Sequence, residues 1–371
     1  MAYTDIDDPS AHFQTLTYTG NGSNPRNLTN TGNSDLKPDF IWTKNRTDTE
    51  SHIVTNSSFG FDAPNATFEG GAGGDETLNG QLSPNLTAKQ NSVAATYGYI
   101  SGHLTNGFTA AAGGTNGDSM NANNKEFVAW QWKANGGTTS TNTDGDINST
   151  VQVNADAGFS VVMYEPENTT ARNIGHGLGA RPGCIIIRNR QRVENWRVWH
   201  QSFGSGSTRL DSTDAYNTTA TTLVNTVNST IFNVGSDFSV NGAFPIAAWC
   251  WAEVQGYSKF GKYTGNGGED GPFCYLGFKP ALLIIKESSS AGGNWVMFDN
   301  TRDPSNVTKH RLFPNLTNAT NTSRDYIDLL SNGFKLRNTD ADHNQNGEVM
   351  IYMAWAENPF VTSTGTPTTA R

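Results

Sequence analysis

One stretch of the chain has oxygen-bearing residues at the spacing of a calcium loop. In "DADHNQNG", Asp342, Asn344 and Asn346 fall at the first, third and fifth positions of such a loop. The bidentate glutamate that completes the loop is missing, because Met353 stands at its position. A hairpin turn is therefore the preferred interpretation, and a weak calcium site at these three residues stays open as the alternative.

A second stretch, "IRNRQRVENWR", combines guanidinium groups with an indole ring. Arginine beside an aromatic ring can bind anionic or sugar ligands through bidentate hydrogen bonds and stacking. A solvated loop is the preferred interpretation, since the matching stretches "TKNRTDTE" and "IKESSSA" lack this composition. The alternative is a weak interaction patch made of Arg188, Arg190, Arg192, Trp196 and Arg197.

Hydrolase motifs are missing from the sequence. It contains neither G-x-S-x-G nor H-E-x-x-H. "NGGEDG" lacks the lysine and the following helix of a phosphate-binding loop, and its Glu269 and Asp270 would repel phosphate. A carboxylate pair for glycoside hydrolysis would need a cleft and a raised pKa, which a sequence does not show. We therefore expect no catalytic residues, no cofactor and no enzyme activity.

The composition excludes several classes of protein. The 371 residues include only 16% charged residues, with a net charge of −9, so the basic footprint of a nucleic-acid-binding protein is missing. No apolar run approaches the ~18 residues of a membrane-spanning helix. Nine Trp, 19 Phe and 11 Tyr supply the large apolar surfaces that disordered chains lack. We expect a folded protein that neither binds nucleic acid nor inserts into a membrane.

The cysteines indicate buried thiols. Cys184, Cys250 and Cys274 each lie within an apolar run, and none has the spacing of a metal-binding pair. The first residues, "MAYTDIDDPS", are polar and acidic and differ from a signal peptide. Synthesis in a cytoplasm without classical export is the expectation.

Internal repetition is the strongest signal in the chain. "YTGNG" occurs at 18–22 and again at 263–267, and Tyr164 holds the matching place in a middle copy that has lost the glycines. In each copy a proline is followed six residues later by a basic residue: Pro38 and Lys44, Pro182 and Arg188, Pro280 and Lys286. "NWRVWH" matches "NWVMFD", and "SHIVTN" fills the same place without its tryptophan. Such order at a domain-sized period predicts three diverged copies of one domain.

Each copy ends on an Ala-Trp pair, which we align as Ala129-Trp130, Ala248-Trp249 and Ala354-Trp355. Each copy also begins with a strand that ends at the repeated tyrosine, and we place Phe13, Phe159 and Phe260 at the heads of these strands. The loss of the glycines in the middle copy argues against a shared ligand loop. We interpret "YTGNG" as a strand-to-loop corner, and we expect binding in loops that differ between copies.

Short alternating stretches separated by Gly, Asn, Asp and Ser predict an all-β fold. The prediction is three tandem antiparallel β-sandwich, jelly-roll-like domains with little helix. Asn-Gly pairs, including 116–117, 241–242, 332–333 and 346–347, would supply the tight hairpin turns. "RDYIDLLSNGF" (324–334) is the one stretch that we expect to form a short helix.

The predicted domain boundaries follow the repeats. Sequence patterns predict an N-terminal attachment segment at 1–12, sandwich repeats at 13–135, 157–256 and 257–360, a polar linker at 136–156 and a polar C-terminal tail at 361–371. The linker has the alternative interpretation of an arm lying on a neighbouring domain. Its length, against the short junction before the third repeat, predicts an elongated or bent three-lobed chain.

Four quoted segments carry a resemblance to a known family: "MAYTDIDDPSAHFQTLTYTGNG", "GHGLGARPGCIIIRNR", "EVQGYSKFGKYTGNGGEDGPFCYLGFKPALLIIK" and "AENPFVTSTGTPTTAR". They resemble tandem-repeat structural proteins of tailed phages, marine ones especially, which are usually taken to be virion surface components. The resemblance implies synthesis in a bacterial cytoplasm and localisation on the virion.

The leading functional hypothesis is therefore a non-enzymatic tail fibre or tail appendage protein that contacts the host surface or neighbouring tail proteins. The alternatives are a capsid decoration or head-fibre protein, a virion-associated carbohydrate-active enzyme, and a lectin unrelated to phage. The expected partners are other virion proteins and a glycan or protein receptor on the host. A homo-oligomer, with a trimer favoured, is the expected assembly.

Overall fold

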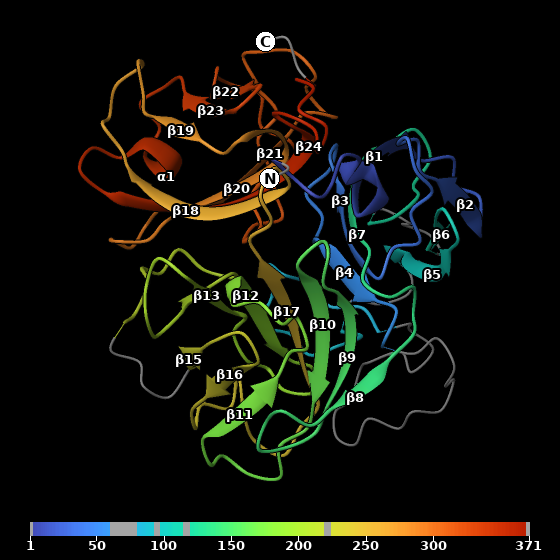
Figure 1. Cartoon of the computed structure of the whole chain (residues 1–371). Helices are drawn as coiled ribbons and strands as arrows, with labels where there is room; N and C mark the ends of the chain where they lie inside the picture. The colour runs from blue at the N-terminus through green and yellow to red at the C-terminus, as the bar shows by residue number, and fades with distance from the viewer. Residues whose placement is uncertain (1–2, 60–79, 93–96, 114–118, 219–223, 369–371) are drawn as a thin grey trace.

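The structure, a computed structural model, consists almost entirely of antiparallel strands (Figure 1). It describes residues 3–59, 80–92, 97–113, 119–218 and 224–368. Within these ranges the helical elements are the 3-10 turn η1 (Pro9–Ala11) and the helix α1 (Ala341–Asn344). No helix in the described part of the chain has the length and apolar character needed to cross a bilayer. The all-β prediction is confirmed.

Three pairs of sheets follow one another along the chain, and we name each pair a unit. Unit 1 (13–132) has a main sheet β1-β7-β3-β4 and a small sheet β2-β6-β5. Its strands are β1 (Phe13–Thr19), β2 (Arg26–Thr29), β3 (Phe40–Asn45), β4 (Ile53–Asn56), β5 (Tyr99–Leu104), β6 (Gly107–Ala111) and β7 (Glu126–Trp132).

Unit 2 (140–252) repeats this arrangement with extra edge strands. Its main sheet has the order β14-β13-β12-β17-β10-β9-β8, and its small sheet the order β11-β16-β15. The strands are β8 (Ser140–Asn142), β9 (Ser149–Asn154), β10 (Phe159–Tyr164), β11 (Arg172–Gly175), β12 (Pro182–Asn189), β13 (Arg197–His200), β14 (Thr208–Arg209), β15 (Val224–Val227), β16 (Ile231–Val234) and β17 (Ile246–Ala252).

Unit 3 (258–359) has the main sheet β18-β24-β20-β21 and the small sheet β19-β23-β22. Its strands are β18 (Ser258–Thr264), β19 (Phe273–Tyr275), β20 (Phe278–Glu287), β21 (Trp295–Asp299), β22 (Ile327–Leu330), β23 (Gly333–Leu336) and β24 (Val349–Pro359). The order of equivalent strands is the same in all three units.

Each main sheet is buried on both faces, which explains why β3, β12 and β20 are nearly continuous runs of buried residues. One face packs on the small sheet of the same unit. In unit 1 this core includes Ile41, Phe108 and Ala129, and in unit 2 a separate core is built in the same way. The opposite face carries Phe40, Trp42 and their equivalents, which join one core cluster shared by all three units.

Three tryptophans, one from each unit, meet in this shared core. The ring centroids of Trp132 and Trp251 are 6.0 Å apart, those of Trp132 and Trp355 5.2 Å, and those of Trp251 and Trp355 5.8 Å. All three pairs have edge-to-face geometry, the arrangement that the ring quadrupole favours. The units therefore surround a common centre (Figure 1), and the prediction of an elongated or bent chain is wrong.

Strand register corrects the sequence alignment of the third copy. Trp132, Trp251 and Trp355 lie opposite Phe13, Phe159 and Ser258 on the first strand of their units. Trp355 therefore corresponds to Trp132 and Trp251, two residues from the position assigned by the repeated Ala-Trp pair. Met353 takes the place of Trp130 and Trp249, and Phe260 is not equivalent to Phe13 and Phe159. A two-residue slip keeps every side chain on its face of the strand, so the pattern alone did not expose it.

The structure differs from two other expectations. The stretch expected to be helical at 324–334 forms most of the hairpin of β22 and β23, whose two-residue turn is Ser331 and Asn332. The stretch 136–156, expected as a linker or an arm, contains β8 and β9, which extend the main sheet of unit 2. Gly242 and Gly347 have positive φ but lie in connections between two sheets, Gly333 does not have positive φ, and the pair 116–117 lies outside the described residues.

The first and last described segments of the chain lie beside unit 3 (Figure 1). The Tyr3 hydroxyl donates to the carbonyl of Gly277 at 2.8 Å, and the Ser363 backbone N–H donates to the Asp7 carboxylate at 2.6 Å. Residues 1–2 and 369–371 of the two expected attachment segments lie outside the described residues. The domain boundaries proposed from the repeats stay predictions.

Candidate functional site

Each unit sends one loop onto the next, and the order of contacts is cyclic. Unit 1 contacts unit 2, unit 2 contacts unit 3, and unit 3 contacts unit 1. One backbone hydrogen bond recurs at the residue that directly follows β12, β20 and β3: Gln90 N–H to Arg190 O (2.8 Å), Tyr216 N–H to Ser288 O (2.8 Å) and Thr320 N–H to Arg46 O (2.9 Å). The chain thus closes a head-to-tail ring with approximate threefold symmetry.

A side chain at a second equivalent position strengthens each junction. Register places His52, Trp196 and Trp295 at the same point of their main sheets. Each ring nitrogen bonds to a carbonyl of the preceding unit: His52 Nε2 with Phe313 O (2.9 Å), Trp196 Nε1 with Ser83 O (3.0 Å) and Trp295 Nε1 with Arg209 O (2.8 Å). The histidine of the first copy therefore makes the same contact that a tryptophan makes in each of the other two copies.

The basic residues that follow the repeated prolines are buried beside these junctions. Lys44 donates to the carbonyl of Asn45 at 2.6 Å, and Arg188 donates to the carbonyl of Thr87 in unit 1 at 2.7 Å. Lys286 donates to the carbonyl of Glu287 at 2.5 Å. Burial lowers the pKa of Lys44 to about 7, that of Lys286 to about 8 and that of Arg188 to about 10. These cations stabilise chain carbonyls and are withdrawn from solvent.

The arginine patch expected from the sequence is for the most part an internal junction. Arg188 and Trp196 are fully buried, and Arg190 is buried against Gln90, whose side-chain oxygen accepts from its Nε at 2.5 Å. Arg197 is largely buried and donates to Ser239 at 2.8 Å, while Arg192 remains partly exposed and pairs with Glu194. The patch is therefore not a single exposed surface, because unit 1 covers half of it.

The expected calcium ligands do not converge on one point. The Asp342 carboxylate accepts from the Asn294 backbone N–H at 2.7 Å and lies 3.3 Å from Arg311. Asn344 is buried and its side-chain amide donates a hydrogen bond within the protein, while Asn346 is exposed. Among the described residues no cluster of acidic, histidine or cysteine side chains has the arrangement of a metal site. The preferred hairpin interpretation is also wrong, because Ala341–Asn344 form the helix α1, and the segment connects β23 of the small sheet to β24 of the main sheet.

Asn344 belongs instead to a corner shared by all three units. The tyrosine of each copy donates to the carbonyl just before an asparagine: Tyr18 to Met120 O (2.7 Å), Tyr164 to Val240 O (2.8 Å) and Tyr263 to His343 O (2.6 Å). In the outer copies, Asn121 and Asn344 accept from the backbone N–H of the asparagine in "YTGNG". These contacts make the repeated motif an internal clamp. Sequence reasoning missed the equivalence of Asn121, Asn241 and Asn344 because they lie far from the motif in the chain.

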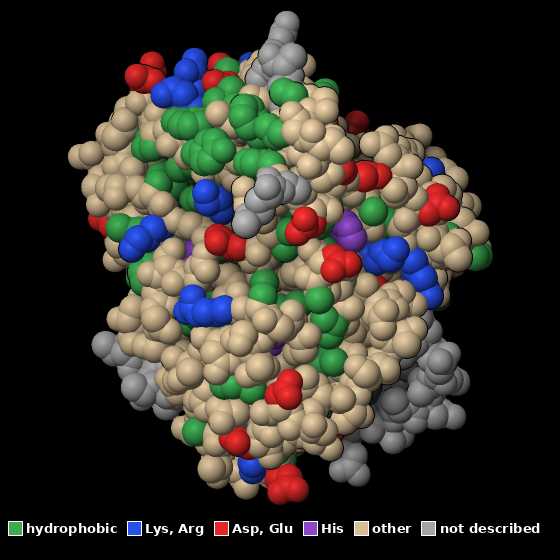
Figure 2. Space-filling view, in the orientation of Figure 1, with side chains coloured by type: hydrophobic (Ala, Val, Ile, Leu, Met, Phe, Trp, Pro, Cys, Tyr) green, Lys and Arg blue, Asp and Glu red, His purple; other side chains and the backbone are tan. Residues whose placement is uncertain are grey.

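One surface distinguishes the units. On the outer face of the small sheets, register places Phe273 and Tyr275 of β19 where unit 1 has Asn27 and Thr29 and unit 2 has Asn173 and Gly175. Phe273 is 48% exposed and Tyr275 50% exposed, whereas Cys274 between them points into the core. Figure 2 shows apolar side chains gathering on the upper lobe, which is unit 3 in the orientation of Figure 1.

Charged side chains frame the aromatic pair. The Lys259 ammonium lies 5.4 Å from the centre of the Tyr275 ring and donates to the Tyr275 carbonyl at 3.1 Å. Lys335 lies directly across the sheet from Phe273, and its ammonium is 2.7 Å from the Asp270 carboxylate. Tyr3 brings its hydroxyl to 3.4 Å from that of Tyr275. We name Phe273, Tyr275 and these flanking groups the aromatic face of unit 3.

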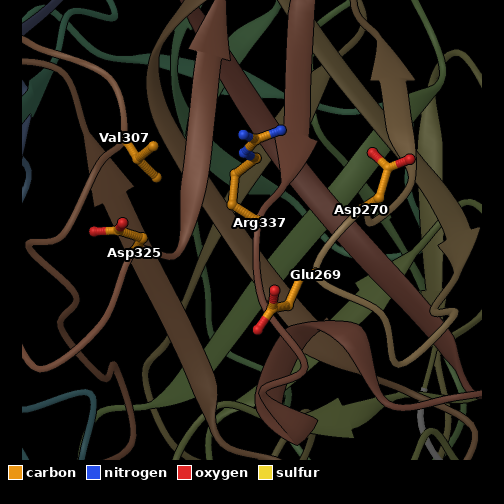
Figure 3. Close-up of a pocket in the computed structure, with 5 residues that line it drawn as sticks. All are labelled: Glu269, Asp270, Val307, Asp325 and Arg337. Carbon is orange, nitrogen blue, oxygen red and sulfur yellow. The ribbon is translucent and has the colours of Figure 1, made fainter.

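A polar hollow of about 410 Å³ adjoins this face through Asp270. Its lining comprises Glu269, Asp270, Val307, Asp325 and Arg337, and Figure 3 shows Arg337 between the loops that carry the acidic residues. Hydrogen bonding to Lys335 lowers the pKa of Asp270, the opposite of what a general acid requires. Asp325 lies 3.0 Å from Lys309, so its charge also has a partner.

The cysteine prediction is confirmed, since Cys184, Cys250 and Cys274 are free and buried. A family model described as a domain of unknown function, DUF7483, matches residues 8–359. The chain belongs to this family. The match covers all three units as one block, from the segment before β1 to the end of β24. No curated protein and no solved structure matches the chain.

Proposed function

We propose that this chain is a non-enzymatic structural protein of a tailed-phage particle, and that it docks on other molecules through the aromatic face of unit 3. The observation that carries the docking proposal is the exposure of Phe273 and Tyr275 where the other two units have small or polar residues. Two large aromatic rings left half-exposed on one strand are typical of a contact surface.

The threefold repetition strengthens this argument because each unit serves as a control for the others. A phenylalanine at the matching buried position, Phe108, Phe232 or Phe334, holds each small sheet to its main sheet. The fold therefore forms with Asn27 or Asn173 in the place of Phe273. The fold does not require these rings at these positions, which supports a role for them in binding.

Assignment to a phage particle rests on the family resemblance of the sequence. Two properties of the molecule suit that setting. Charged residues make up only 16% of the chain, so its surface interactions depend weakly on salt. The shared core and the cyclic junctions tie all three units together, which favours persistence outside a cell. A tail fibre or tail appendage is the leading position, with a host glycan or protein receptor or a neighbouring tail protein as partner.

A capsid decoration protein is the second candidate, and the closed ring favours it. Three units around one centre make a compact body, whereas a fibre subunit is usually extended along the fibre axis. The third candidate, a carbohydrate-active enzyme, would need the carboxylates of the polar hollow. Two of these carboxylates, Asp270 and Asp325, form ion pairs with lysines, which supports a structural role for them. Release of reducing sugar from host polysaccharide would revive the enzyme hypothesis.

A comparison of normal particles with tailless, DNA-filled heads tests the assignment. A tail component is expected in intact particles and missing from tailless heads, whereas a decoration protein is expected in both. Its absence from every particle fraction would overturn the proposal. In the same experiment, the double variant Phe273→Asn/Tyr275→Thr is expected to fold normally but to be missing from particles. If the aromatic face binds a receptor, the variant is expected to lose binding to host cells instead.

The predicted homo-oligomer, with a trimer favoured, remains a separate proposal. Three like domains suit threefold assembly, but the cyclic junctions satisfy that symmetry within one chain. Sedimentation of the purified chain tests the oligomer, since a monomer across the micromolar range would contradict it.

A further inference from the structure

The outer edge of the small sheet has different environments in units 2 and 3. In unit 2 the edge strand β11 is covered by a segment that leads from β8 to β9. Ile147 of that segment forms a parallel bridge with Ile174. The backbone N–H of Asp146 donates to the carbonyl of Asn173 at 2.8 Å. The segment 145–147 is thus a short added strand supplied by the chain itself.

The side chain of Asp146 completes this contact. Its carboxylate accepts the backbone N–H of Asn173 at 2.8 Å, so both outward groups of that residue are satisfied. The Ser149 hydroxyl donates to the carbonyl of Gly175 at 2.7 Å, which satisfies the next outward acceptor. Ile147 also packs against the core of unit 2, where Ile174 is fully buried. An aspartate followed by an aliphatic residue is therefore what this edge accepts.

The matching edge in unit 3 is β19. The backbone N–H of Leu336 donates to Pro272 O, and that of Leu276 donates to Asn332 O, so the groups of residues 272 and 276 face β23. Because the direction alternates along a strand, the N–H and C=O of Phe273 and Tyr275 point away from the sheet. In the described part of the chain β19 pairs only with β23, so no strand covers this side. Lys259 donates to the carbonyl of Tyr275, so the part of the edge that is open to an added strand is centred on Phe273.

We propose that the edge of β19 accepts an extended polypeptide segment of a partner protein as an added parallel strand, in the place that residues 145–147 occupy on β11. The segment would carry Asp or Asn followed by an aliphatic residue. The first accepts the Phe273 N–H through its side chain and donates its own N–H to the Phe273 carbonyl. The second lies opposite Cys274, the equivalent of Ile174.

The aromatic rings give this edge its affinity. Backbone hydrogen bonds in strand addition are common to any sequence, and pockets for alternate side chains supply specificity. Phe273 and Tyr275 flank the added strand on the outer face and can cover the side chains on either side of its aliphatic residue. An exposed apolar edge strand without a partner is an aggregation hazard that proteins ordinarily avoid. The inference deepens the proposed function, on which it rests for the existence of a partner.

Eight-residue peptides and the full chain test the proposal. The probe is TDGDINST, the sequence of residues 143–150, together with two analogues that replace its isoleucine by leucine or valine. Mass spectrometry measures the hydrogen exchange of the segment 272–276. At saturating peptide, exchange of one backbone amide in this segment is expected to slow at least tenfold. A peptide N-methylated at the second aspartate cannot donate to the Phe273 carbonyl and is expected to lose the effect.

Two double variants provide matched controls. Phe273→Asn/Tyr275→Thr installs the unit 1 residues in unit 3 and is expected to weaken peptide binding at least tenfold. Asn27→Ala/Thr29→Ala alters the equivalent positions of unit 1 and is expected to leave binding unchanged. Circular dichroism and the denaturation midpoint of each variant confirm that it folds.

Several outcomes would overturn the inference. One is unchanged exchange in 272–276 with all three peptides, and another is equal protection by the N-methylated peptide. Binding of host oligosaccharides that depends on Phe273 and Tyr275, without peptide binding, would make the face a sugar platform instead. Self-association abolished by the same double variant would make the occupant a second copy. The chain could be found in particles while the peptides fail, and then the proposed function stands without this inference.

Discussion

The small sheets of units 1 and 3 have the same strand order and register, yet they present different outer surfaces. Leu28 and Cys274 are equivalent and point inward, where Phe108 and Phe334 pack on them from the neighbouring strand. At the preceding position, on the outer face, unit 1 has Asn27 and unit 3 has Phe273. The difference shows that the fold constrains the inner residues of these strands and leaves the outer ones free to vary.

The junctions between units teach the complementary lesson. There the three copies use different side chains for one contact, since His52 bonds to a carbonyl as Trp196 and Trp295 do. Closure of the ring constrains the geometry of these positions more than their chemistry. Variation at a junction therefore does not indicate a binding site, whereas variation at the exposed edge of β19 is the basis of the proposed one.

The largest expected effect comes from the tryptophans at the centre. Trp132→Ala removes a fully buried ring that contacts both Trp251 and Trp355, and the free energy of unfolding is expected to fall by about 3–5 kcal/mol. Denaturant unfolding followed by tryptophan fluorescence measures the change. Tyr275→Ala is the matched control and should alter stability by less than about 0.5 kcal/mol, because that ring is half-exposed. Equal losses in the two variants would contradict a shared core.

A smaller effect is expected at the junctions. His52→Ala leaves the Phe313 carbonyl and the Trp42 indole N–H without their partner, at a cost of about 1–3 kcal/mol. His52→Gln keeps one donor and one acceptor and is expected to recover part of the loss. Thermal unfolding of both variants measures the difference. A neutral His52→Ala would show that unit 3 does not depend on unit 1 at this contact.

The three corner tyrosines are expected to respond alike. Tyr18→Phe, Tyr164→Phe and Tyr263→Phe each remove one hydroxyl that donates to a buried carbonyl, and each should cost about 1 kcal/mol. The middle copy is the informative one, because it has lost the glycines of the motif. A cost confined to Tyr18 and Tyr263 would indicate that the motif has a role beyond architecture.

A pH dependence of the free energy of unfolding is expected from Lys44. Its pKa is about 7 in the folded chain and about 10.4 when unfolded. Between these values the unfolded chain binds more protons, so this residue makes the free energy of unfolding rise with pH from about 7 to about 10. Lys44→Met should flatten that rise when compared with the unaltered chain in denaturant titrations at several pH values. An identical slope in the two proteins would contradict a desolvated lysine.

The fold class follows from the sequence because short strands, turn residues and repeats are local signals. The pairing of Pro38 with Lys44 and its counterparts also located equivalent strands correctly. The closed ring did not follow, since it depends on loops that contact residues ~100 positions away, and no local pattern records such contacts. The long stretch between the first two copies suggested separation, whereas β9 pairs with β10 and joins the sheet of unit 2.

The candidate sites followed the sequence less well. Arg188 and Trp196 have the composition of a binding patch, but the same residue types satisfy buried carbonyls at a junction. Phe273 and Tyr275 were not predicted as site residues, because the apolar run "FCYLG" does not reveal that its strand lies at the edge of a sheet. An alignment of the three copies by strand register would have exposed them, since they replace Asn and Thr.

A density map of the whole particle tests the central claim most directly. The account predicts the three-unit ring at a defined position on the particle or at its contact with the host, with Phe273 and Tyr275 covered by another molecule. An added strand along β19 would confirm the mode of binding as well. The chain present on the particle with the aromatic face of unit 3 open to solvent, and another surface in contact, would contradict the account.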